Sequence, residues 1–137
     1  MQASNKPIGI FDSGIGGLTV WKAVREGLPY EDILYYGDSR YAPYGSKSPD
    51  EILERARTCT EFLLAKNAKL IVVACNTATA AAIESLRAEY PVPFVGMEPA
   101  IKPASLMSKT GRIGVLATAG TFDGELFKRN QSKYGAY

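Results

Sequence analysis

The stretch LIVVACNTATAAAIESL, residues 70–86, passes from an apolar run through Cys75 into an alanine-rich segment. The apolar run is rich in β-branched residues, which is typical of a parallel strand buried on both faces. The alanine-rich segment that follows predicts a helix, which Pro91 closes. A strand that leads directly into a helix is the repeating unit of parallel α/β sheets.

The same alternation extends to both sides of this stretch. Four more short apolar segments predict strands, at residues 8–11, 33–38, 92–97 and 112–118. Helical patterns lie between or after them, at 18–28, from Ser48 onward, in a short piece within 98–111, and at 121–134. We therefore predict an α/β fold in which a parallel sheet is flanked by helices.

The helix that begins near Ser48 has the clearest start signal. Ser48 is a good N-cap, Pro49 suits the first helical position, and Glu51 stands where a capping box needs an acid. The residues that would share one face of this helix are Ile52, Ala56, Cys59 and Leu63. We expect this face to be buried, with Cys59 as a small core residue.

Composition and charge narrow the class of protein. The 137 residues suffice for one ordinary domain, and a net charge of +2 with interspersed signs argues against a nucleic-acid-binding surface. No apolar run is long enough to span a membrane, and the polar start MQASNKP does not resemble a signal peptide. We expect a cytoplasmic protein without nucleic-acid or membrane partners.

The chain contains two cysteines and no histidine. The spacing of the cysteines fits no CxxC metal or redox motif, so we expect no metal site. The lack of histidine excludes a Cys–His dyad or a Ser–His–Asp triad built from these residues alone.

Small polar residues follow every predicted strand. Ligands of parallel sheets bind beyond the carboxyl ends of the strands, so these residues predict a pocket for a small polar molecule. They are Asp12 and Ser13, Asp38 and Ser39, Cys75 to Thr77, Glu98, and Thr118 with Thr121.

The sequence DSGIGG, residues 12–17, has two interpretations. Its glycines could expose backbone amides at a helix N-terminus and bind a small anion, although Asp12 would repel a pyrophosphate. It could equally be a plain strand-to-helix turn capped by Asp12 or Ser13. The loop DSRYAPYGSKS, residues 38–48, is weak evidence by itself.

Cys75 differs from Cys59 in its position. It ends a buried strand beside a helix N-terminus, where backbone amides and the helix dipole favour the reactive thiolate. A buried strand cysteine is the alternative, but the polar strand ends around it favour a functional role.

Four motifs in this order, IGIFDSGIGGLTV, YYGDSRYAPYG, VVACNTATA and GVLAT, make the chain resemble the amino-terminal half of the bacterial glutamate racemase family. The resemblance implies a cofactor-independent enzyme that interconverts L- and D-glutamate for peptidoglycan by using two cysteines. One thiolate removes the Cα proton and the other thiol protonates the opposite face. No lysine follows a strand where a pyridoxal phosphate mechanism would need one, which agrees with the lack of a cofactor.

The resemblance also implies roles for individual residues. Cys75 corresponds to the first catalytic cysteine, and Asp12 would assist its proton transfer. Glutamate would be bound by Asp12, Ser13, Pro43, Tyr44, Gly45, Asn76, Thr77, Thr118 and Thr121.

The family's second catalytic cysteine lies in a CTH motif that this sequence lacks. The resemblance implies a two-lobe fold, so we expect residues 1–97 to form the first lobe and 98–137 to begin the second. We expect such a partial chain to be inactive alone, and the resemblance leaves room for a homodimer.

Three alternatives stay open. Aspartate racemase or another member of the superfamily shares the two-cysteine plan. A non-catalytic amino-acid-binding module would use Cys75 only for packing. A cysteine hydrolase or redox protein would need groups that this chain does not contain.

Overall fold

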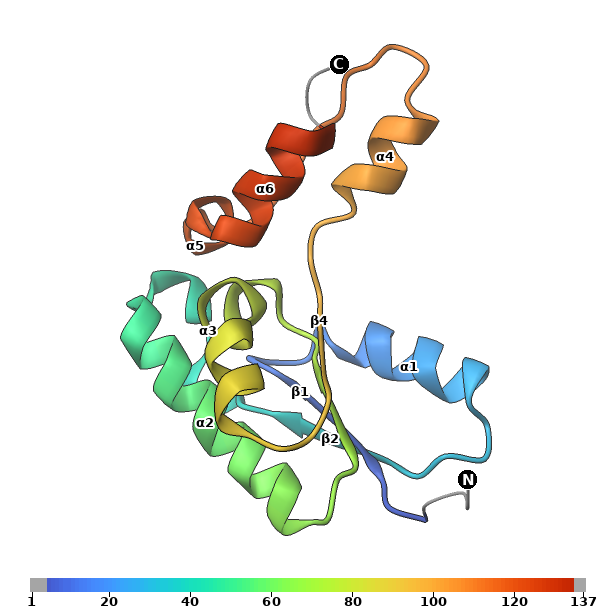
Figure 1. Ribbon diagram of the computed structural model, residues 1–137, viewed down its shortest axis with the longest axis vertical. Coiled ribbons are helices and arrows are strands. Elements are labelled where there is room, and N and C mark those ends of the chain that lie inside the picture. The colour runs from blue at the N-terminus through green and yellow to red at the C-terminus, as the bar shows by residue number, and fades with distance from the viewer. Residues whose placement is uncertain (1–4, 135–137) are drawn as a thin grey trace.

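The computed structural model describes residues 5–134, which form a parallel four-stranded sheet with helices on both faces (Figure 1). The strands are β1 (Ile8–Asp12), β2 (Ile33–Gly37), β3 (Leu70–Val73) and β4 (Phe94–Gly96), in the spatial order β2-β1-β3-β4. Each strand runs parallel to its neighbours. The predicted fold class is confirmed.

The helices divide between the two faces of the sheet. Helix α1 (Leu18–Gly27) packs on one face, where it lies against a buried cluster of strand residues. Its Val20, Trp21 and Val24 pack against this cluster, which consists of Ile8, Ile10 and Val72. Helices α2 (Pro49–Ala65) and α3 (Asn76–Glu89) cover the other face and form the larger core (Figure 1). The two central strands are therefore buried on both sides, as their apolar sequences predict.

Helix α2 begins as its sequence predicts. The Ser48 side chain accepts a hydrogen bond from the Glu51 backbone, and the Glu51 side chain accepts one from the Ser48 backbone, so the capping box is complete. The four residues predicted to share the buried face of this helix, Ile52, Ala56, Cys59 and Leu63, are all buried. These predictions are confirmed.

The described residues after β4, 97–134, lie beyond the sheet and contain helices and irregular segments but no strand. After β4 the chain runs to α4 (Ile101–Met107) and then returns to α5 (Ala119–Asp123), which lies against α3. Helix α6 (Glu125–Tyr134) leads away again and packs beside α4 (Figure 1). The helix predicted at 121–134 is thus two helices, because Gly124 adopts an extended backbone between them.

The strand predicted at residues 112–118 is wrong. These residues have no regular secondary structure, and Leu116, a central residue of the apolar pattern, is fully exposed. A strand is stable only when a neighbouring strand pairs with its backbone. No strand within residues 5–134 lies beside this segment, so its apolar pattern finds no ladder to join.

Candidate active site

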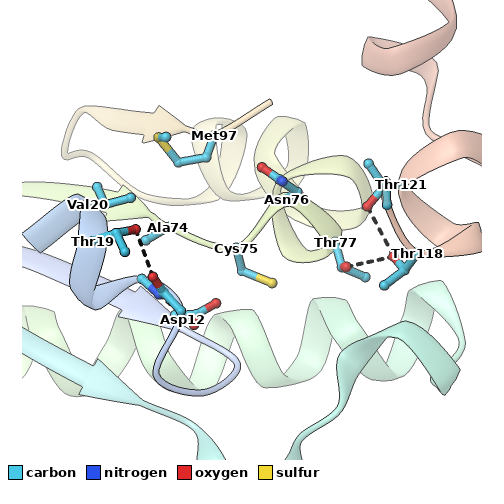
Figure 2. A pocket seen from close by; sticks show the side chains of 13 residues that line it. Asp12, Thr19, Val20, Ala74, Cys75, Asn76, Thr77, Met97, Thr118 and Thr121 are labelled. Carbon is cyan, nitrogen blue, oxygen red and sulfur yellow. Dashed lines mark hydrogen bonds between the residues drawn. The ribbon is translucent and has the colours of Figure 1, made fainter. Parts of the chain in front are cut away.

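A cavity of about 410 Å³ lies at the carboxyl ends of β1 and β3 (Figure 2). This is the edge of the sheet where a ligand is expected in a parallel α/β fold. Six of the residues predicted from the sequence line it together, namely Asp12, Cys75, Asn76, Thr77, Thr118 and Thr121.

Cys75 lies where β3 passes into α3, and it is the N-cap residue of that helix. Its sulfur accepts a hydrogen bond from the Ala78 backbone N–H at 3.4 Å, and its thiol donates to Ser13 Oγ at 3.6 Å. The residue is 7% exposed and faces the cavity (Figure 2). The first turn of α3 therefore directs the Ala78 amide toward the sulfur.

Asp12 ends β1 and forms the capped turn, which is one of the two interpretations of the DSGIGG sequence. Its Oδ2 accepts hydrogen bonds from the backbone N–H groups of Gly14 at 3.3 Å and Gly17 at 3.0 Å, so the carboxylate caps the turn before α1. The same buried side chain also lines the cavity. The capping hydrogen bonds thus fix the carboxylate at the cavity wall.

Gly17 is required where the turn packs most closely. A Cβ atom at this position would lie 2.8 Å from Asp12 Cβ and 2.9 Å from Ala74 Cβ. A Cβ at Gly14 would meet nothing within 4 Å. We expect Gly17→Ala to lower the free energy of unfolding by about 1–3 kcal/mol, because these neighbours must move.

Gly14→Ala in the same turn is the matched control and should leave stability nearly unchanged. Urea unfolding followed by circular dichroism would compare the two variants. Equal free energies of unfolding in the two variants would contradict the prediction, because they would mean that the neighbours of residue 17 move without loss of stability.

Tyr35 supports this turn and was missed by the sequence analysis, because its partner is distant in the chain. Its hydroxyl donates to the Gly14 carbonyl oxygen at 2.9 Å. Burial, together with the nearby charges of Asp12 and Cys75, raises the pKa of Tyr35 to about 12. The phenol therefore stays protonated and remains a donor at neutral pH.

Three threonine hydroxyls form a chain at the far side of the cavity. Thr77 Oγ1 and Thr118 Oγ1 lie 2.9 Å apart, and Thr118 Oγ1 and Thr121 Oγ1 lie 3.1 Å apart (Figure 2). They join the start of α3 to the start of α5, two segments that are distant in sequence. The sequence pattern predicted each of these residues individually but not the contact between them.

The other predicted binding residues do not line this cavity. Ser13 reaches it only through its contact with Cys75. Tyr44 is 1% exposed, and its hydroxyl donates to Asp38 at 2.7 Å instead of pointing to the cavity. Gly45 lies against Thr118, and Pro43 precedes both in the loop.

Two polar strand ends are also engaged elsewhere, which corrects the expectation that all of them form one pocket. Asp38 is buried in an ion pair with Arg55. Glu98 accepts a hydrogen bond from Asn130 of α6. Each carboxylate is bound by another side chain of the protein, and neither lines the cavity.

Cys59 is a core residue, as predicted. It has no exposed surface, and burial, with the nearby charge of Asp38, raises the pKa of its thiol to about 12. It is therefore a neutral thiol at physiological pH and cannot act as a second base.

Residues 5–134 contain neither a candidate metal site nor a candidate membrane-spanning helix. No cluster of three or more Cys, Asp or Glu side chains there could hold a metal ion. None of the helices in this range combines the length and apolar character that crossing a bilayer requires.

Comparison with known proteins places this chain in a family. The Asp/Glu/hydantoin racemase family matches residues 18–137. The chain belongs to that family.

Named relatives within the racemase family include glutamate racemases. The chain is 50% identical over 131 residues to the glutamate racemase of Stutzerimonas stutzeri, with 95% of this chain and 50% of the relative covered. It is 53% identical over 128 residues to that of Methylococcus capsulatus, with 93% and 47% covered. The chain therefore spans about half the length of these racemases.

Solved racemase structures share its fold. The glutamate racemase of Aquifex pyrophilus superposes with a TM-score of 0.86 at 45% identity, with 95% of this chain and 52% of that chain covered. The Escherichia coli glutamate racemase, solved with L-glutamate and the activator UDP-MurNAc-ala, gives 0.86 at 37% identity, with 94% and 49% covered.

Proposed function

We propose that this chain forms one half of a cofactor-independent racemase that interconverts L- and D-glutamate. The observation that carries the proposal is the position of Cys75, whose sulfur lies on a small polar cavity beside Asp12 at a helix N-terminus. Its glutamate racemase relatives support the choice of substrate.

In this mechanism the Cys75 thiolate removes the Cα proton from one face of glutamate. A second thiol, supplied from outside this chain, delivers a proton to the opposite face, so the configuration inverts and the two cysteines exchange protonation states. Asp12 assists proton movement at Cys75. Neither step requires an oxidant, a reductant or a cofactor.

The difficulty of this reaction is the charge that develops when the Cα proton leaves. That charge is delocalised into the substrate carboxylate, where preorganised hydrogen-bond donors stabilise it best. We assign this role to the side chains of Asn76, Thr77 and Thr118 and to the first amides of α3. Ser13 keeps the Cys75 sulfur oriented, and Thr121 holds Thr118.

The remaining assignments follow from this function. Residues 1–97 form the first lobe and residues 98–137 begin the second, which places the cavity near the junction of the two. The product D-glutamate serves cytoplasmic peptidoglycan synthesis, and the complete enzyme can function as a homodimer.

A hybrid protein would test the function. We define the hybrid protein as this chain joined to the carboxyl-terminal half of the Stutzerimonas stutzeri racemase. We expect it to exchange the Cα proton of both L- and D-glutamate for deuterium in heavy water, measured by NMR, and to exchange aspartate far more slowly. This chain alone should exchange neither.

A folded hybrid protein that exchanges neither amino acid would contradict the proposal. Faster exchange of aspartate than of glutamate would instead identify an aspartate racemase.

A further inference from the structure

An ion pair lies beneath the loop between β2 and α2. Arg55 of α2 donates from Nε and Nη2 to the two carboxylate oxygens of Asp38, both at 2.9 Å. The Asp38 side chain is 3% exposed and that of Arg55 is 20% exposed. Such a bidentate pair fixes both the distance and the orientation of its two partners.

The loop is also held at a second point. The Arg55 guanidinium stacks on the Tyr41 ring, 3.7 Å from its centroid. Arg55 itself lies on a helix whose start is fixed by the Ser48 capping box. One arginine therefore holds the loop at Asp38 and at Tyr41.

A continuous set of contacts leads from this pair to the cavity. The Tyr44 hydroxyl donates a hydrogen bond to Asp38, and this bond fixes the position of the tyrosine in the core. The next residue, Gly45, packs so tightly on Thr118 that a Cβ atom there would lie 2.7 Å from Thr118 Cγ2. Thr118 lines the cavity and shares a hydrogen bond with Thr77.

The charges of the pair persist over the whole physiological range. Burial alone would raise the pKa of Asp38, but hydrogen bonds from Arg55 and Tyr44 outweigh it and lower the pKa below its ordinary value. The hydrogen bond to Asp38 in turn raises the pKa of Arg55. The contacts are thus present wherever the site would operate.

We propose that Arg55 is a positioning residue of the active site, because it sets Thr118 at the cavity wall through Asp38, Tyr44 and Gly45. Arg55 touches no part of the cavity itself. The effect on catalysis rests on the proposed racemase function, whereas the effect on the loop does not.

Substitution of Arg55 in the hybrid protein would test this role. Arg55→Met removes both hydrogen bonds, and Arg55→Lys keeps the charge but not the bidentate geometry. We expect Arg55→Met to reduce kcat/KM for glutamate by about tenfold to a hundredfold. The change should be mainly an increase in KM, because Thr118 would no longer be held in the position that binds glutamate. Arg55→Lys should recover part of this loss.

Arg57→Met is the matched control, since Arg57 lies on the same helix and pairs with Glu54 and Glu89 at the surface. It should leave KM and kcat within about twofold of the parent, as is usual for an exposed pair. A stabilising pair without a positioning role would lower the melting temperature of Arg55→Lys and leave its KM unchanged. That result would overturn the proposal.

Hydrogen exchange in this chain provides a test that is independent of activity. In Arg55→Lys, the backbone amides of residues 44–47 should exchange about tenfold faster than in Arg57→Lys, because the loop opens locally more often. Equal exchange would overturn the proposal even if the hybrid protein is inactive. An inactive hybrid protein with the faster exchange would overturn the racemase function alone.

Discussion

Replacing Cys75 with serine in the hybrid protein is expected to slow the interconversion of L- and D-glutamate by about a thousandfold in either direction, because a positioned general base typically contributes 10²–10⁴-fold. A hydroxyl is far less acidic than a thiol and provides almost no anionic base at neutral pH. Both directions are affected because Cys75 removes the proton in one direction and returns it in the other.

Serine is chosen because of what Cys75 does for the fold. The Cys75 sulfur caps α3 by accepting from the Ala78 N–H, and serine is among the best N-cap residues. The Cys75→Ser variant should therefore keep the stability of the parent while losing its chemistry. Thermal unfolding, measured beside the rate at which one enantiomer of glutamate is converted into the other, would separate these two effects.

Cys59→Ala is the control for loss of a thiol as such. Cys59 is buried in the core and its pKa is raised to about 12, so the substitution removes no reactive group. We expect its rate of racemisation to remain close to that of the parent. Undiminished racemisation in Cys75→Ser would instead show that Cys75 only packs and is not the base.

The second large effect concerns stability. Asp38→Ala is expected to lower the free energy of unfolding by about 3–5 kcal/mol, the range found when one partner of a buried ion pair is removed. The substitution leaves the Arg55 guanidinium and the Tyr44 hydroxyl without their acceptor. Urea unfolding at neutral pH would measure the difference from the parent chain.

The same pair predicts a pH dependence. The folded-state pKa of Asp38 is below its unfolded-state value of about 3.9, so its contribution is complete at neutral pH. The contribution declines as the pH falls below the unfolded-state value and through the folded-state one. The parent should therefore lose more stability than Asp38→Ala between neutral and strongly acidic pH.

Glu89→Ala serves as the comparison, because Glu89 pairs with Arg57 at the surface. Water screens such a pair, so its removal should cost much less than removal of Asp38. A similar loss in both variants would mean that burial adds nothing to the Asp38 pair.

Local patterns were sufficient to predict most of the fold. The capping box at Ser48 and the spacing of Ile52, Ala56, Cys59 and Leu63 depend only on neighbouring residues, and the structure confirms both. The strand at 112–118 could not be judged in this way. Whether an apolar segment becomes a strand depends on a pairing partner, which lies outside the segment itself.

The candidate site was predictable in its composition but not in its contacts. Strand ends identified Asp12 and Cys75 because parallel strands share one carboxyl edge. Thr118 was predicted at the end of a strand that the structure does not contain, and it reaches the cavity as the N-cap residue of α5. The burial of Tyr44 was not predictable, because loop residues are normally exposed. Tyr44 is buried because its hydroxyl binds Asp38, and Asp38 can be buried because it pairs with Arg55 of the next helix. Arg55 gave no signal in the sequence for the same reason.

The unequal burial of the two thiols has a practical consequence for chemical probes. Cys75 lines the cavity, whereas Cys59 has no exposed surface. We therefore expect a mild electrophile to label the folded chain at Cys75 alone. A ligand tethered there would extend between Asp12 and the threonine hydroxyls, which makes this cysteine an attachment point for covalent screening of the cavity.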